Sequence, residues 1–126
     1  MQKYIPTPTE DTEQAHIFAW AAWARGKYPE LDLMHHIPNG GKRSKSEAAR
    51  FKAQGVKAGV PDICLPCARG GYHGLYIELK RTKGGKLSAA QKEWIDALRG
   101  QDYKAVVCYG FDEAKGIITE YLESGR

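Results

Sequence analysis

The sequence lacks any long hydrophobic run. No apolar stretch approaches the roughly 20 residues that a helix needs to span a bilayer. Residues 1–6 lack the apolar core of a secretory signal peptide. Internal repeats and low-complexity tracts are absent as well. These absences argue against a membrane-spanning or secreted protein, and we expect an intracellular, cytoplasmic protein with no membrane partner.

Cysteine is scarce and odd in number, since the chain contains Cys64, Cys67 and Cys108 only. An odd count fits reduced thiols better than a disulfide framework. Cys64 and Cys67 have CxxC spacing, but a zinc ribbon needs a second such pair. A thiol redox motif begins a helix, whereas this pair lies at the end of a predicted strand. A thiol redox protein built on this pair is therefore a minor alternative.

Acidic residues are almost missing from two stretches that are rich in bases. Six bases and a single acid lie between Lys42 and Lys57, and five bases and no acid lie between Lys80 and Lys92. The whole chain of 126 residues has a net charge of +4 and 42% hydrophobic residues, as expected for one globular domain covering residues 1–126. The basic stretches suit nucleic acid, because phosphate contacts supply most sequence-independent affinity. A solvated basic surface is the alternative.

A glycine-rich turn, Pro38-Asn39-Gly40-Gly41, comes just before the first basic stretch. Its glycines allow the backbone to approach a phosphate, although an ordinary loop is the default for such a turn. The residues that we expect to contact DNA are Asn39, Lys42, Arg43, Lys45, Arg50, Lys57, Arg81, Lys83 and Lys86.

Two short β-prone segments, 63–65 and 75–80, flank a cluster of turn residues around Gly70 and predict a β-hairpin. Asp62 and Glu78 are symmetric about Gly70, so a turn without a bulge places them opposite each other, with Cβ atoms about 4.5 to 5.5 Å apart. Side chains alternate along a strand, so Lys80 shares the face of Glu78. Ile77 and Leu79 then point the other way, into a core.

This D…ExK arrangement places two carboxylates and an amine on one surface. Two facing carboxylates repel each other unless a cation or a shifted pKa compensates. One divalent cation could bridge them, which indicates a metal-dependent nuclease. Because the pattern is short and common, a surface hairpin whose charges face water is the alternative.

The first helix is predicted from its start signals. Thr7-Pro8-Thr9-Glu10 offers an N-cap, a proline at the first helical position and a capping-box glutamate, and the helix should run to about Arg25. Glu13 falls on a helical face with Ile17 and Trp20, so its carboxylate either lies in the buried stripe and needs a partner or lies at the solvated edge of the stripe. Both interpretations stay open.

The remaining segments alternate between strand and helix. Residues 31–37 are expected to form a strand, Ser44 to Gly55 and Ser88 to Gly100 two capped helices, residues 105–109 a central strand, and 112–122 an amphipathic helix. In the second capped helix Gln91 occupies the capping-box position and serves at least as a cap. The order of elements predicts an α/β domain in which helices flank a mixed β-sheet.

Five segments in one order carry a resemblance to a known nuclease family: 12–14, 37–43, 55–62, 74–80 and 87–91. In these segments, which span most of the chain, it resembles the VRR-Nuc domains of the PD-(D/E)xK nuclease superfamily. The resemblance implies a restriction-endonuclease-like core.

The resemblance also implies a metal site. Asp62, Glu78 and the main-chain carbonyl of Leu79 would hold Mg²⁺ or Mn²⁺, with Glu13 completing the site. The choice of Glu13 over Glu10 rests on the predicted capping role of Glu10.

The resemblance places Lys80 near the attacking water and Gln91 beside the active site. Standalone domains of this size resemble viral or bacterial homodimers that cut branched DNA, including four-way junctions. The expected partners are therefore DNA and a second copy of the chain. A non-catalytic nucleic-acid-binding module is the alternative function, and it would bind DNA in EDTA without ever cutting it.

Overall fold

The computed structural model describes residues 5–38 and 44–125, and three predicted DNA contacts, Asn39, Lys42 and Arg43, lie outside the described residues. The elements are α1 (Glu10–Ala24), the 3₁₀ helix η1 (Pro29–Leu33), β1 (His35–His36), α2 (Lys45–Ala53), β2 (Ile63–Leu65), β3 (Leu75–Lys80), α3 (Ala89–Gly100), β4 (Lys104–Tyr109) and α4 (Phe111–Glu123). The predicted α/β class is confirmed, and the order of elements matches the prediction except for η1.

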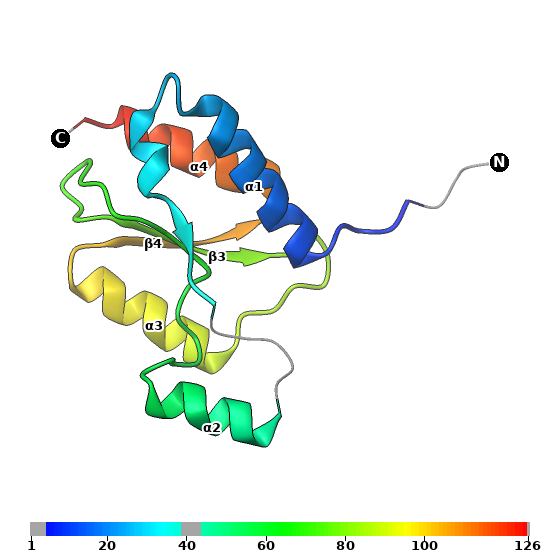
Figure 1. The fold of residues 1–126 in the computed structure, drawn as a ribbon. Coiled ribbons are helices and arrows are strands. Elements are labelled where there is room, and N and C mark those ends of the chain that lie inside the picture. Colours follow the sequence, from blue (N-terminus) through cyan, green and yellow to red (C-terminus); the bar gives the residue numbers. More distant parts are fainter. Residues whose placement is uncertain (1–4, 39–43, 126) are drawn as a thin grey trace.

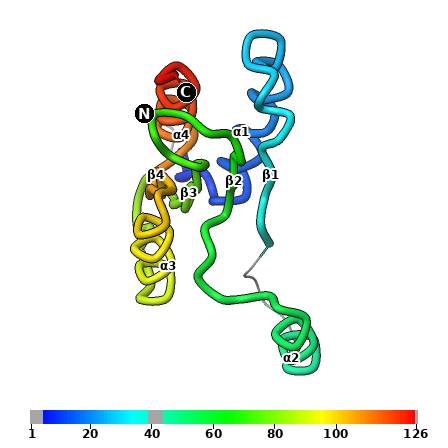
Figure 2. The backbone as a smooth tube through the Cα atoms, turned by 90° about the vertical axis from the view of Figure 1, so that its left-hand side faces the viewer, coloured from blue at the N-terminus to red at the C-terminus, as the bar shows by residue number. Residues whose placement is uncertain are grey.

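The strands form one mixed sheet in the order β1-β2-β3-β4. β1, β2 and β3 are antiparallel neighbours, whereas β4 runs parallel to β3. A parallel pair needs a crossover connection, and α3 supplies it. Helices α1 and α4 cover one face of the sheet and α3 lies on the other (Figure 1). Figure 2 shows the sheet from another side, with α2 set apart from these layers.

The main core lies between the sheet and the pair α1 and α4. Ile63, Ile77 and Leu79 face it from the strands, and Ile17 and Ile118 face it from the helices. Each of these side chains is at most 1% exposed. Burial of one such side chain contributes about 1.5 to 3 kcal/mol to stability. The predicted inward direction of Ile77 and Leu79 is confirmed.

The predicted start of the first helix was wrong by two residues. The N-cap is Thr9 rather than Thr7, because Thr9 has extended backbone angles and its side chain accepts a hydrogen bond from the Thr12 amide. Glu10 is therefore the first helical residue and does not serve as a capping-box glutamate. Its carboxylate is exposed.

The strand predicted over residues 31–37 was largely wrong. Pro29 begins η1, which ends at Leu33, and only His35 and His36 form a strand. Leu31 and Met34 are both buried. Residues three apart lie on one side of a 3₁₀ helix, so the apolar spacing here reflects that period.

The strand predicted over 105–109 exists, but it is not central. β4 forms the edge of the sheet within the described residues. Its apolar sequence reflects burial on both faces, by α3 on one side and α4 on the other (Figure 1). Its outer edge is partly covered, because the Nε of Arg99 donates a hydrogen bond to the Ala105 carbonyl at 2.9 Å.

In the described part of the chain, no helix has the length and apolar character needed to cross a membrane.

Candidate active site

The hairpin of β2 and β3 brings the two central acids together. Ile63 pairs with Ile77, and the same register extended by one residue sets Asp62 opposite Glu78. The predicted register about Gly70 is therefore confirmed. The Asp62 carboxylate takes the place of a strand partner for β3, because its Oδ2 accepts a hydrogen bond from the Leu79 amide at 2.8 Å.

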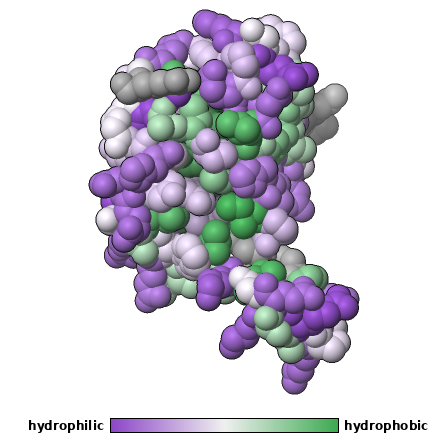
Figure 3. All heavy atoms as spheres, turned by 60° about the vertical axis from the view of Figure 1, so that its left-hand side comes forward, coloured by the Kyte–Doolittle hydropathy of each residue, from purple (hydrophilic) through white to green (hydrophobic). Residues whose placement is uncertain are grey.

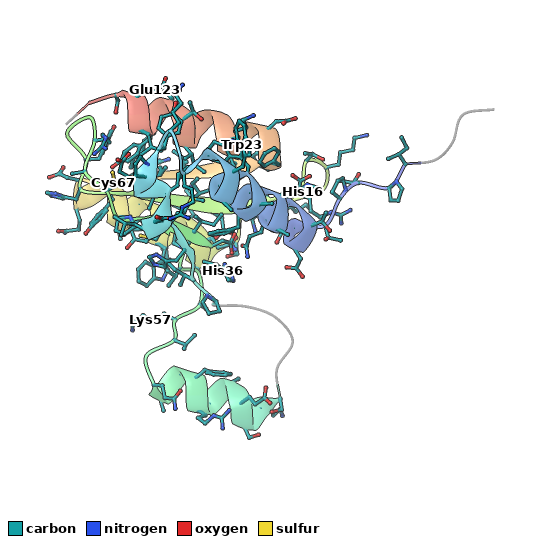
Figure 4. The ribbon with its side chains drawn as sticks, turned by 45° about the horizontal axis from the view of Figure 1, so that its top comes forward. His16, Trp23, His36, Lys57, Cys67 and Glu123 are labelled. Carbon is teal, nitrogen blue, oxygen red and sulfur yellow. The ribbon has the colours of Figure 1, made fainter. Side chains whose placement is uncertain are left out.

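The backbone of Asp62 is held from the other side by β1. Its carbonyl accepts one hydrogen bond from the Ile37 amide at 2.7 Å and one from Nδ1 of His36 at 2.8 Å. A carbonyl oxygen only accepts, so Nδ1 of His36 carries the proton. The sequence did not indicate this role of His36, because the role depends on the pairing of β1 with β2. Figure 4 labels His36 on the side of the molecule's body that faces α2.

Glu78 is the most unusual ionisable group of the site. Its side chain is 2% exposed, and its Oε1 has no hydrogen-bond partner among the described residues. Burial first, and then the hydrogen bond and charge of Asp62, raise the pKa of Glu78 to about 9, against a smaller opposing effect of Lys80. At neutral pH the metal-free carboxyl is therefore protonated.

Lys80 shares the face of Glu78, as predicted. Its Nζ lies 3.9 Å from the Oε2 of Glu78. The sequence had placed these side chains on an open surface, however, and both are buried, Lys80 to 6% exposure. The loop after β3 folds back over Lys80, and a Cβ added to Gly85 would lie 2.9 Å from the Lys80 Cβ.

The main-chain carbonyl of Leu79 faces the same edge of β3 as Asp62. Even-numbered residues of β3 direct their peptide groups toward β4, as shown by the hydrogen bond from the Gly110 amide to the Lys80 carbonyl. The amide of Leu79 points the opposite way, to Asp62. Because both peptide groups of one strand residue face the same side, the Leu79 carbonyl also points toward the edge that carries Asp62.

Glu13 is buried and has a structural partner. Its Oε2 accepts a hydrogen bond from the Phe111 amide at the start of α4. The N-cap of α4 is Gly110, which has no side chain to cap the helix, so Glu13 supplies the missing acceptor and a negative charge. The buried interpretation of Glu13 is confirmed, and the solvated-edge interpretation was wrong. Glu10 is exposed, yet its charge contributes to the raised pKa of Glu78.

Gln91 caps α3 as predicted. Its Oε1 accepts from the Ser88 amide at 2.9 Å, and its own amide donates to the Ser88 hydroxyl at 3.1 Å. The same helix end receives the segment before Asp62. Gly59 has φ +92°, and a Cβ added there would lie 2.7 Å from the backbone of Ala90, so only glycine fits.

The predicted DNA contacts in the described residues fall into two groups. Arg81, Lys83 and Lys86 lie in the loop that covers Lys80 and are exposed. Lys45 and Arg50 belong to α2, and Lys57 lies on the segment returning from it (Figure 4). The first group lies in the loop that follows β3 and contacts Lys80, whereas α2 stands away from the sheet (Figure 1).

The CxxC pair does not have the features of a redox site. Cys64 and Cys67 are buried and not disulfide-bonded. Burial raises the pKa of the Cys64 thiol, which disfavours the reactive thiolate.

The acids fit a hard cation. A buried carboxyl with an unsatisfied oxygen, a second carboxylate and a main-chain carbonyl are the oxygen ligands that Mg²⁺ and Mn²⁺ prefer. Within residues 5–38 and 44–125, no three His, Cys, Asp or Glu side chains converge on one point. Asp62 and Glu78 thus face each other without a third such side chain converging on them in the described part of the chain.

The raised pKa of Glu78 predicts how the metal-free protein responds to pH. The unfolded chain releases the Glu78 proton near pH 4.5, whereas the folded protein keeps it until about pH 9. The folded state binds more protons in this window, so stability falls as pH rises from about 5 to 9. We expect the thermal midpoint in EDTA to fall less steeply in Glu78→Gln, which cannot ionise.

The control for this measurement is Glu120→Gln, which removes an exposed glutamate on α4. It should keep the wild-type slope of thermal midpoint against pH. Equal slopes for Glu78→Gln and wild type would show that Glu78 is ionised in the folded protein.

Comparison with known proteins agrees with this geometry. The VRR-NUC domain family matches residues 9–112. A solved structure titled VRR_NUC domain protein is similar to the chain with a TM-score of 0.83 and 40% identity, over 96% of this chain and 93% of that one. Among curated proteins no match is found. The chain therefore belongs to the VRR-NUC domain family, a nuclease-type domain of the PD-(D/E)xK class.

Proposed function

We propose that this protein is a Mg²⁺- or Mn²⁺-dependent endodeoxyribonuclease. It hydrolyses phosphodiester bonds in branched DNA, with four-way junctions as the preferred substrate, and it acts as a homodimer. The observation that carries the proposal is the buried Glu78 carboxyl, which faces Asp62 and has an oxygen without a partner among the described residues. This pair is unfavourable in the absence of a cation and is suited to binding one.

Asp62, Glu78 and the Leu79 carbonyl would hold the cation. When bound, it lowers the pKa of a coordinated water and offsets the negative charge that develops on the phosphodiester. The Leu79 amide and the β1 contacts fix Asp62 on both sides. The protein therefore contributes one ligand, Asp62, that its own backbone contacts hold in place before substrate binds.

Lys80 supplies the positive charge of the site. It is buried, and its Nζ lies within 4 Å of the Glu78 carboxylate. From this position it either orients the attacking water or stabilises the negative charge of the pentavalent phosphorus transition state. Gln91 acts beside the site by fixing the start of α3, on which Gly59 packs.

An acid from α1 completes the site in this proposal. Glu13 remains the prediction from the sequence, but two observations favour Glu10. The Glu13 carboxylate is already engaged at the start of α4. Glu10 is exposed, is not used as a cap, and contributes its charge to the raised pKa of Glu78.

Substitution of Glu10 and of Glu13 should have opposite effects on metal binding and on stability. Glu10→Gln should weaken Mn²⁺ binding, measured by titration calorimetry, and leave the thermal midpoint unchanged. Glu13→Gln should lower stability by about 1 kcal/mol, because α4 loses the negative charge at its start, and should leave Mn²⁺ affinity close to wild type. The reverse pattern would identify Glu13 as the ligand.

The exposed bases would hold the DNA backbone. Arg81, Lys83 and Lys86 lie in the loop beside the acids, and Lys45, Arg50 and Lys57 lie on and after α2. Asn39, Lys42 and Arg43 are proposed from the sequence alone. Such contacts give an affinity that falls steeply as salt increases.

The proposal of a homodimer has one supporting observation on the surface. Trp23 on α1 is 82% exposed, beside the exposed Ala19 and Ala22. A two-fold interface brings the same surface patch of both subunits together, and an uncharged patch of this kind avoids like-charge repulsion. Two active sites in one dimer would allow paired cuts in a junction.

A cleavage assay tests the function. A labelled four-way junction, a linear duplex and a single strand are each incubated with Mg²⁺, Mn²⁺ or EDTA. We expect paired nicks in the junction that require the metal and are lost in Asp62→Asn and Lys80→Ala. Asp32→Asn, which changes an exposed acid paired with Arg25, is the control and should cut normally. Binding without scission under every metal condition would support a non-catalytic nucleic-acid-binding module instead.

A further inference from the structure

Helix α2 stands apart from the body of the protein. Figures 1 and 2 show it beyond the sheet from two directions, and Figure 3 shows it as a separate lobe. None of its nine residues is buried, and only Phe51 is half-buried. A helix this short is marginal in water without tertiary packing. Among the described elements, none packs extensively against α2, so the sheet and the other helices add little to its stability.

The sequence nevertheless favours a helix at this place. The Ser44 side chain accepts a hydrogen bond from the Glu47 amide and caps the start. Arg50 and Lys52 lie in the last turn, where positive charge is favourable. Gly55 follows with φ +94°, a conformation in which glycine commonly ends helices. These local signals lower the cost of forming the helix, but they supply no packing.

The chain between β1 and β2, which carries α2, is held at both ends beside the candidate active site. The Ile37 amide donates to the Asp62 carbonyl at 2.7 Å, which joins the segment leaving β1 to the segment entering β2. Gly59 packs against Ala90 at the start of α3, and Pro61 is buried. The two ends of the segment that carries α2 are therefore anchored to β2 and α3.

The charge of this segment indicates what it binds. Residues 44–57 carry the bases Lys45, Arg50, Lys52 and Lys57 against Glu47 alone. The apolar residues of α2 are limited to Phe51 and three alanines, so the helix offers little apolar surface to a protein partner. Two copies of α2 brought together would repel each other, because each carries an excess of positive charge. A phosphodiester backbone is complementary to this surface, whereas a contact of α2 with α2 of a second copy is not.

We propose that α2 and the segment that follows it, up to Lys57, form an arm that binds the DNA backbone beside the cut site. Bound DNA would then stabilise the helix. This inference rests on the proposed DNA substrate. It adds a role for Lys52, and it assigns to the arm a share of the sequence-independent affinity separate from that of the loop Arg81–Lys86.

The test compares two triple variants of equal charge. Lys45→Gln, Arg50→Gln and Lys52→Gln neutralise the arm. Lys27→Gln, Lys104→Gln and Lys115→Gln neutralise three lysines outside the arm and the loop. Binding of a fluorescent duplex is followed by anisotropy in EDTA at several salt concentrations, so that scission plays no part.

We expect the arm variant to bind more weakly and to lower the slope of log affinity against log salt by about 0.9 for each lost phosphate contact, up to roughly 2.7. The slope of the control variant should differ from that of wild type by less than the effect of one phosphate contact, about 0.9. Equal slopes for the two variants would overturn the proposal. So would a change from dimer to monomer in sedimentation that is confined to the arm variant, because the arm would then be a subunit interface.

Limited trypsin digestion of the wild type gives a second readout. Cleavage after Lys45, Arg50 and Lys52 should come first in the absence of DNA, and DNA in EDTA should protect these bonds. Cleavage at equal rates with and without DNA would contradict the proposal. Hydrolysis of bis-p-nitrophenyl phosphate by the wild type with Mn²⁺ tests the nuclease proposal separately. If no hydrolysis occurs, the nuclease proposal is wrong, and the binding data in EDTA still decide whether the arm binds DNA.

Discussion

The burial of the Glu78 carboxyl beside Asp62 is the constraint around which the rest of the site is arranged. Burial and the neighbouring carboxylate both oppose ionisation of Glu78 and raise its pKa to about 9. The single lysine contact at 3.9 Å does not overcome this effect. A fold that keeps an unsatisfied carboxyl oxygen in its interior loses stability unless another group binds there. The arrangement is explained if a divalent cation completes the site.

The neighbouring elements hold Asp62 from both sides. β1 fixes the Asp62 backbone through His36 and Ile37, and β3 fixes its side chain through the Leu79 amide. Glu13 joins α1 to the start of α4, so that the two helices that cover the core meet through a charged contact. The basic residues of α2 and of the loop after β3 are exposed, in contrast to the buried Glu78 and Lys80.

The hairpin and its register could be predicted from the sequence because they are local. Symmetry about Gly70 sufficed to set Asp62 opposite Glu78. Long-range pairings could not be predicted in this way. The partner of Glu13 is Phe111, far away in the chain, and the role of His36 depends on which strand lies beside β2. The edge position of β4 was missed because burial by helices on both faces gives an edge strand the same apolar sequence as a central one. The burial of Lys80 depends on how the following loop folds back.

Crystals of the protein grown with Mn²⁺ and measured at the manganese absorption edge would test the central claim most directly. The account predicts an anomalous peak in contact with the carboxylates of Asp62 and Glu78 and the carbonyl of Leu79, and no such peak in Glu78→Gln. A well-ordered site without manganese between these groups, or manganese bound elsewhere in both proteins, would contradict it.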